Sequence, residues 1–227
     1  SKKSFKDLIK FARKMKIDGA SCVDVGGESS RPGADYVSFE EEKKRVLPLI
    51  KNLDQEGIIV SIDTRKNKIM ELAMNEGASI VNDVTGFRKN DSMDLIVNYH
   101  KSNPMKGNVI IMHMQGNPKN MQDKPNYNFA PIDIFEFLKK QIVKFVEKGL
   151  PIDKIVIDPG FGFGKNIIHN LELMNWLSMF HGLGVPILIG ISRKSMIAKL
   201  SNNEPTSKRL PGSIALTLNA VKSGVQL

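Results

Sequence analysis

The stretch VIDPGFGFGK, residues 156–165, starts as an apolar β-strand, reaches Asp158 and then breaks into three glycines separated by phenylalanines. It fits neither of the common glycine-rich phosphate motifs. A P-loop needs four residues between its glycines and a Ser or Thr after its lysine, but here the outer glycines have three residues between them and Asn166 follows Lys165. A dinucleotide fingerprint needs the spacing G-x-G-x-x-G, whereas these glycines alternate. The stretch therefore predicts a buried strand with an acid at its carboxyl end.

The chain around this stretch alternates between strand-like and helix-like segments. Six short β-rich runs predict strands at residues 21–25, 58–62, 79–82, 109–113, 154–157 and 186–191. Helical patterns lie at residues 38–53, 66–76, 92–101, 132–148, 170–180 and 212–222. Such alternation is typical of parallel strands connected by helices. Because no linker or low-complexity segment interrupts it, we expect a single domain over residues 1–227.

Polar residues at the strand ends favour one of the two architectures that fit this pattern. They are Asp24, Asp63, Asn82, His113, Asp158 and Ser192. In a (β/α)8 TIM barrel such ends converge on one mouth, whereas in an open doubly wound sheet they spread along an edge. We therefore predict the barrel. A barrel needs eight strands, so we expect the first and last strands to lie before Ser1 and after Leu227, since two unpaired edges would be an aggregation hazard.

Composition narrows the function classes. The net charge of +9 comes from dispersed lysines, and only 7% of residues are aromatic, so a stacking nucleic-acid surface is not favoured. No apolar run is long enough to span a membrane, and residues 1–14 lack the apolar segment of a secretory signal. The single cysteine, Cys22, fits a reducing compartment, so we expect a cytoplasmic protein. The four histidines lack zinc-ligand spacing.

Three of the strand-end residues point to a ligand. Asp63, Asn82 and Asp158 would each, taken alone, be explained as caps of helices or turns. Together at one mouth they favour a ligand with several N–H donors. The 2-amino-4-oxopyrimidine edge of a pterin has that pattern, since its amino group and ring N–H can both bind one carboxylate.

Two loops carry further candidate groups. Residues 190–200, GISRKSMIAKL, place Lys194 and two serines between a strand and a helix start, where anions are favoured. Residues 26–34, GGESSRPGA, contain Arg31, whose planar guanidinium suits phosphate. The alternatives are solvated loop charges for the first segment and a turn-rich connection for the second.

Taken together, these segments resemble the dihydropteroate synthase family. The matching stretches are DVGGESSRPGA, SIDTRK, VNDVTG, IMHMQGNPKNMQ, IVIDPGFGFGKN, ILIGISRKSMI and RLPGSIAL, which appear in the family's order between Asp24 and Leu216. The resemblance implies a (β/α)8 barrel in folate biosynthesis and a sulfonamide target. It also implies a transferase that condenses 6-hydroxymethyl-7,8-dihydropterin pyrophosphate with para-aminobenzoate, releasing pyrophosphate and 7,8-dihydropteroate.

The resemblance also implies roles for individual residues. The pterin would be held by Asp63, Asn82, Val84, Met112, Asp158, Leu188, Gly190 and Lys194. Pyrophosphate and aminobenzoate would be bound by Ser30, Arg31, Pro32, Phe163, Ser192 and Ser195, with Ser30 standing where the family usually has Thr. Asp63, Lys194 and Arg31 would act in catalysis. Ordinary core packing is the alternative for Phe163.

Two family motifs are absent from this chain. They are N-x-T-P-D-S-F, whose Asn binds Mg²⁺ and pyrophosphate, and R-x-H, which binds pyrophosphate. The resemblance still implies Mg²⁺ as cofactor, with no metal ligand in this chain, and a homodimer. Fusion of this protein to another folate enzyme is a further expectation. The alternatives are a methyltetrahydrofolate methyltransferase-like domain, an inactive fragment of the synthase, and a basic barrel that binds nucleic acid.

Overall fold

The fold centres on a sheet of parallel strands. The computed structural model describes residues 4–31, 33–88 and 90–227. Its strands are β1 (Val23–Gly26), β2 (Val60–Asp63), β3 (Ile80–Asp83), β4 (Asn108–Met112) and β5 (Ile155–Asp158). They pair in parallel in the order β1-β2-β3-β4-β5. This order never reverses, which is the arrangement of a barrel, whereas a doubly wound sheet reverses at a switch point.

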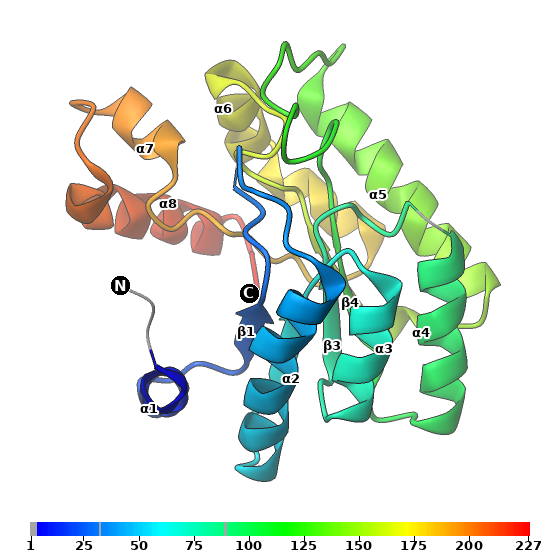
Figure 1. Cartoon of the computed structure of the whole chain (residues 1–227). Helices are drawn as coiled ribbons and strands as arrows, with labels where there is room; N and C mark the ends of the chain where they lie inside the picture. The colour runs from blue at the N-terminus through cyan, green and yellow to red at the C-terminus, as the bar shows by residue number, and fades with distance from the viewer. Residues whose placement is uncertain (1–3, 32, 89) are drawn as a thin grey trace.

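A helix connects each pair of neighbouring strands, and a long loop precedes the helix after β1 and the helix after β4. The connecting helices are α2 (Phe39–Gln55), α3 (Asn67–Asn75), α4 (Asn90–Ser102) and α5 (Ala130–Glu147). In Figure 1, α3 lies between α2 and α4 along one side of the sheet, and these neighbouring helices contact each other. Helices in sequence along one face also fit a barrel, since a doubly wound sheet has helices on both faces.

The sequence predicted these four helices to within two residues at each end. A cap explains the start of α2, because the Ser38 hydroxyl accepts a hydrogen bond from the N–H of Glu41 at 3.3 Å. The Glu41 carboxylate accepts from Arg45 at 2.7 Å. Ser38 is therefore the N-cap that fixes the first turn of α2.

The remaining elements flank the sheet. They are α1 (Phe5–Ile17), η1 (Ile152–Lys154), α6 (Ile167–Asn175), η2 (Leu177–Leu183), α7 (Ser195–Leu200), η3 (Thr206–Lys208) and α8 (Leu210–Lys222). The predicted helix 170–180 was wrong in its bounds. It begins earlier because Asn166 Oδ1 accepts from the N–H of His169 at 2.9 Å and caps α6, and its second half is the 3₁₀ helix η2.

The predicted sixth strand, residues 186–191, was also wrong in extent. It forms one parallel bridge, Ile157 to Ile187. The N–H of Ile157 donates to Pro186 O at 3.0 Å, and the N–H of Leu188 donates to Ile157 O at 2.8 Å. On its other side the segment meets residues 226–227, where Leu227 N donates to Ile187 O at 3.1 Å. Both ladders are too short for a regular strand, and among the described residues the sheet is open.

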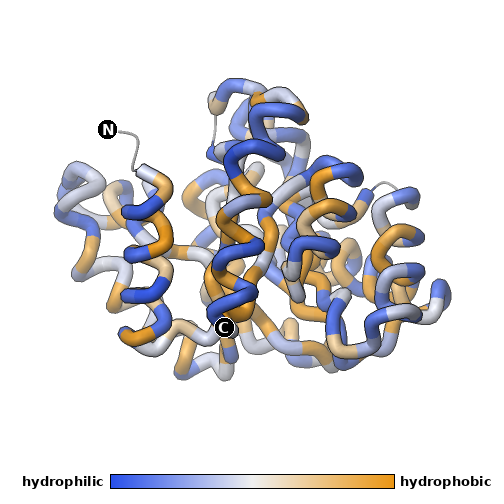
Figure 2. Tube along the Cα trace, turned by 60° about the horizontal axis from the view of Figure 1, so that its bottom comes forward, coloured by the Kyte–Doolittle hydropathy of each residue, from blue (hydrophilic) through white to orange (hydrophobic). Residues whose placement is uncertain are grey.

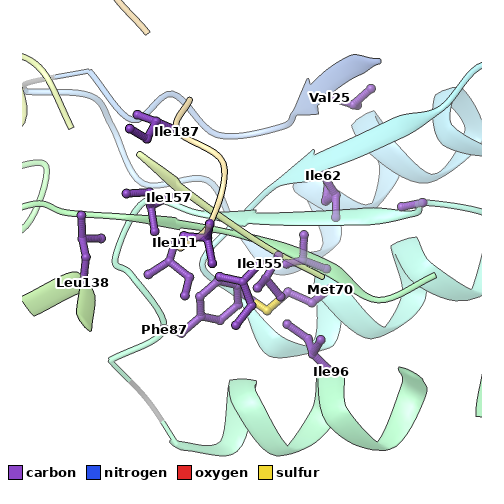
Figure 3. Packing of buried hydrophobic residues seen from close by; sticks show 14 of the residues in the cluster. Val25, Ile62, Met70, Phe87, Ile96, Ile111, Leu138, Ile155, Ile157 and Ile187 are labelled. Atoms are coloured by element: carbon purple, nitrogen blue, oxygen red, sulfur yellow. The ribbon is translucent and has the colours of Figure 1, made fainter. Parts of the chain in front are cut away.

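The main core lies between the sheet and its helices. Figure 3 shows strand residues Ile62, Ile111, Ile155 and Ile157 packed with Met70, Phe87 and Ile96. Phe87 and Phe145 meet edge to face, with ring centroids 5.1 Å apart. This packing fixes the strands, and hence the side chains at their carboxyl ends.

The helices are amphipathic rather than uniformly apolar. Hydrophilic and hydrophobic positions alternate along their turns in Figure 2, as expected when one side of each helix packs on a sheet. Among the described residues, no helix has the length and apolar character needed to cross a membrane.

Candidate active site at the carboxyl ends of the strands

The strand register brings the predicted ligand-binding residues to one edge of the sheet. Asp63 is paired with Asn82 across β2 and β3, and Met112 with Asp158 across β4 and β5. Figure 1 shows the loops after β1, β4 and β5 on the same side of the molecule, at the top of the view. The structure therefore gathers the acids and the amide named from sequence at one mouth.

Neighbouring residues at the end of β3 face opposite ways, as strand geometry requires. The Asp83 carboxylate is buried and accepts from the N–H groups of Thr85 at 2.8 Å and Phe87 at 3.1 Å. This is the local turn-capping role that Asx residues often have. Asn82 is half-buried and lies on the other face, beside Asp63.

Asp63 is half-buried in a strongly acidic environment. Burial raises its pKa to about 8, with further contributions from the charges of Asp24, Asp83, Glu42 and Glu28. In the free protein near neutral pH, Asp63 is therefore mostly protonated. A ligand that brings positive charge would favour the carboxylate form.

The raised pKa of Asp63 has a consequence for stability. A carboxyl that holds its proton more tightly in the folded state gives stability below its unfolded pKa and loses it as pH rises towards the folded value. We therefore expect Asp63→Asn to melt above the wild type at about pH 9 and close to it at about pH 4. Thermal unfolding across this range measures the gap. A gap that does not grow with pH, or that also appears with Asp153→Asn at an exposed position, would contradict this.

Asp158 and Lys194 are near enough for their charges to influence each other, although 36 positions separate them in the chain. The Asp158 carboxylate is buried and accepts from the N–H of Gly160 at 2.7 Å. Burial raises the pKa of Asp158, and the Lys194 charge is the largest opposing influence. Burial lowers the pKa of Lys194, which Asp158 opposes in turn. The Lys194 ammonium donates to Phe161 O and lies 4.7 Å from the centroid of the Phe163 ring.

A small apolar cluster, separate from the main core, lies beside these charges. Its buried members are Val84, Met112, Met114 and Met121, and half-buried Phe163 packs against them. Sequence reasoning named Val84, Met112 and Phe163 but missed the other two methionines. Met114 could have been found, since it follows Met112 by two positions. Packing explains part of the Phe163 position, but its ring also contacts the Lys194 ammonium.

The loop after β1 also borders the mouth. Half-buried Ser30 lines a cavity together with Ser29, Asp63, Thr64, Val84 and Pro118. Arg31 is exposed, and its N–H donates to Ser29 Oγ at 3.3 Å. Pro32 lies outside the described residues.

An ion-pair network that sequence reasoning missed anchors this loop. Glu28 binds Arg65 and Lys66, and Lys66 also binds Glu42. Glu42 is fully buried and accepts from the Thr64 hydroxyl at 2.7 Å. Burial works against ionisation of Glu28, but Lys66 and Arg65 outweigh it and lower its pKa. Arg65 and Lys66, the two basic residues that closely follow Asp63, were the feature of the sequence that could have indicated this network.

The residues next to Lys194 in the chain are exposed to solvent. Arg193 has a positive φ of 52°, and its N–H donates to Ser213 Oγ at 2.8 Å. Ser192 and Ser195 are exposed on either side of this pair. Leu188 and Gly190 are half-buried, and a Cβ on Gly190 would lie 3.8 Å from the Lys194 ammonium. The strained turn therefore directs Lys194, and not Arg193, towards the mouth.

The glycine turn after β5 leaves no room for a side chain at Gly160. This residue has φ of +75°, and a Cβ there would lie 1.9 Å from His113 O. We expect Gly160→Ala to destabilise the protein by more than about 2 kcal/mol, since the left-handed conformation alone costs about 1–2 kcal/mol. Gly184→Ala is the matched control, because φ is +71° with nothing within 4 Å of the added Cβ. Equal losses in denaturant unfolding would show that the clash is absent.

The fold and the mouth fit a class of enzyme, the parallel α/β barrel with its functional groups at the carboxyl ends of the strands. A family model described as pterin binding enzyme matches residues 1–227. Dihydropteroate synthase of Escherichia coli strain K12 is 39% identical over 222 residues, covering 97% of this chain and 76% of that protein. The enzyme of Clostridium beijerinckii is 41% identical over 213 residues, covering 92% and 74%.

Solved structures of dihydropteroate synthases are similar to this chain and agree with the predicted TIM barrel. Yersinia pestis dihydropteroate synthase in a sulfonamide drug complex has a TM-score of 0.92 at 37% identity, covering 98% of this chain and 79% of that one. The Thermus thermophilus enzyme in complex with 4-aminobenzoate has a TM-score of 0.88 at 38% identity, covering 96% and 81%. The chain belongs to the dihydropteroate synthase family of pterin-binding enzymes.

Proposed function

We propose that this chain condenses 6-hydroxymethyl-7,8-dihydropterin pyrophosphate with para-aminobenzoate, giving 7,8-dihydropteroate and pyrophosphate. The observation that carries the proposal is the Lys194 ammonium over the Phe163 ring, near enough to the buried Asp158 carboxylate for the two charges to influence each other. It provides an anion for a pterin edge, a cation for ring heteroatoms and an aromatic surface for a second ring. Relatives solved with 4-aminobenzoate and with a product support it.

The pterin lies at the carboxyl ends of β2 to β5 in this proposal. Asp158 accepts from the 2-amino group and the adjacent ring N–H, which suits a carboxylate with two acceptor atoms. Asn82 and Lys194 serve the remaining heteroatoms, and Val84 and Met112 cover the ring. Leu188 and Gly190 line the other side, where a glycine leaves the ring room beside Lys194.

The reaction needs little base catalysis. The C–O bond between the pterin methylene and pyrophosphate breaks, and pyrophosphate leaves with the electron pair. The aminobenzoate nitrogen then forms the new C–N bond and loses a proton to solvent. Positive charge builds up on the dihydropterin during departure, and Asp63 is the nearby acid that stabilises it as a carboxylate. The protein contributes positioning and electrostatic stabilisation.

The second substrate and the leaving group lie between the loops in this proposal. Phe163 contacts the aminobenzoate ring, and Ser195, with Ser192, borders its carboxylate end. Arg31 and Ser30 reach the pyrophosphate. Arg31 suits this role because its side chain is exposed at the mouth and its planar guanidinium can donate two parallel hydrogen bonds to a phosphate.

Mg²⁺ remains a proposal taken from the resemblance. Among the described residues, no group of three or more His, Cys, Asp or Glu side chains could hold a metal ion. No step above depends on the ion.

The assembly and location are proposed on similar grounds. An exposed apolar stripe on α8, formed by Leu210, Ile214, Leu218 and Val221, supports a homodimer. A cytoplasmic location is supported by the free thiol of Cys22. Fusion to another folate enzyme stays a prediction.

Product formation tests the proposed reaction. The chain is incubated with dihydropterin pyrophosphate, Mg²⁺ and para-aminobenzoate, and dihydropteroate is followed by chromatography. We expect product that depends on both substrates and is released with equimolar pyrophosphate. Methyl transfer from methyltetrahydrofolate instead, or steeply salt-dependent RNA binding without turnover, would replace this function with one of its rivals.

A further inference from the structure

Every backbone carbonyl of the turn from Gly160 to Gly164 accepts a hydrogen bond from a side chain. Lys165 Nζ donates to Gly160 O at 2.8 Å and to Phe163 O at 3.0 Å. Gln122 Nε2 donates to Gly162 O at 2.7 Å, and the Tyr127 hydroxyl donates to Gly164 O at 2.7 Å. Lys194 donates to Phe161 O. Five consecutive carbonyls bound in this way hold a turn that its three glycines would otherwise leave free.

Lys165 makes the largest share of these contacts from a buried position. Its ammonium also lies 3.0 Å from His113 Nδ1 and 3.3 Å from His113 O. Burial lowers the pKa of Lys165 well below its usual range, with Asp158 opposing. Burial and the Lys165 charge lower the pKa of His113, so a neutral imidazole accepts. The partners of the Lys165 ammonium are therefore mainly backbone carbonyls.

Two other donors, Gln122 and Tyr127, come from the loop after β4, whose ends are joined by hydrogen bonds. Gln115 Nε2 donates to Asn126 O at 2.7 Å, and the N–H of Asn126 donates to Gln115 Oε1 at 2.8 Å. Gln122 and Tyr127 therefore extend from a tied loop onto the glycine turn. The Phe163 ring depends on both segments, since Phe163 lies between Gly162 and Gly164.

We propose that Lys165, with Gln122 and Tyr127, is a positioning residue that sets the Phe163 ring for the arylamine substrate. This inference rests on the proposed function and deepens it. It predicts a selective effect, because the sheet fixes the Asp158 backbone: Asp158 is paired with Met112, and the N–H of His113 donates to Asp158 O at 2.9 Å. Loss of the carbonyl donors should therefore disturb the aminobenzoate site more than the pterin site.

The test compares two lysine variants by steady-state kinetics. Lys165→Met keeps most of the side-chain length and removes the donors, and we expect the KM for para-aminobenzoate to rise by about tenfold. The KM for dihydropterin pyrophosphate should change by less than about twofold. Lys106→Met is the matched control, since Lys106 Nζ also donates to a backbone carbonyl, Gly77 O at 3.1 Å, at the other end of the sheet. We expect no such split for it.

Milder variants keep the test decisive if Lys165→Met does not fold. Gln122 is exposed, and Tyr127→Phe removes only a hydroxyl, so Gln122→Ala and Tyr127→Phe should fold and show the same split at smaller size. Amide hydrogen exchange over residues 161–165 should also speed up in each variant, with or without turnover. Equal rises in both KM values, or unchanged exchange, would overturn the proposal. An inactive wild type would instead count against the proposed function.

Discussion

Asp158→Asn is expected to weaken binding of dihydropterin pyrophosphate by about a hundredfold or more. The carboxylate has two acceptor oxygens for two N–H donors, whereas an asparagine would turn its own N–H₂ towards one of them. At a buried position such a donor–donor contact leaves both groups unpaired, at a cost of about 1–3 kcal/mol each. Asp158 is also buried, so water cannot substitute.

Calorimetric titration of the pterin into wild type and variant measures this effect. Asp153→Asn is the control, because Asp153 is exposed at the opposite end of β5. In Asp158→Asn the N–H of Gly160 still finds an acceptor in the amide oxygen of the new side chain, so the turn should persist. Retained affinity in this variant would mean that another group binds the pyrimidine edge.

Asp63→Asn is expected to lower kcat by about a hundredfold while changing pterin affinity by less than about tenfold. The reason is that a carboxylate at Asp63 stabilises charge that develops only as pyrophosphate leaves. An interaction made mainly in the transition state appears in kcat and not in binding. Equal losses in kcat and in affinity would assign Asp63 to binding alone.

The dependence of kcat/KM on pH is an independent test of the role of Asp63. Because the pKa of Asp63 is raised to about 8, the ionised fraction in the free protein grows as pH rises through that value. If the carboxylate is the active form, kcat/KM for the pterin substrate rises with pH and levels off above about 8. In Asp63→Asn this rise should be absent.

Local patterns were enough to predict most of the secondary structure. The helix predicted at 38–53 is α2, Phe39–Gln55, because a capping serine and helical periodicity are both local signals. The strand predicted at 186–191 is only a bridge. Its apolar composition is that of a strand, but strand formation depends on neighbours that composition does not reveal.

The site was harder to predict where distant segments meet. Acids at strand ends predicted one mouth, since parallel strands share an edge. Glu42 would be expected on a solvated helix face, yet it is fully buried because Lys66 and Thr64 reach it from another loop. Lysine is a residue type usually found at the surface, so Lys165 would likewise be expected there. Only the packing of the glycine turn onto His113 explains its burial and its contacts.

A crystal structure of the chain with 6-hydroxymethylpterin tests the proposed pterin site most directly. We expect the ring at the carboxyl ends of β2 to β5, with its amino group and ring N–H about 3 Å from the Asp158 carboxylate and one face against Met112. A pterin bound outside this mouth, or one whose pyrimidine edge turns away from Asp158, would contradict this site.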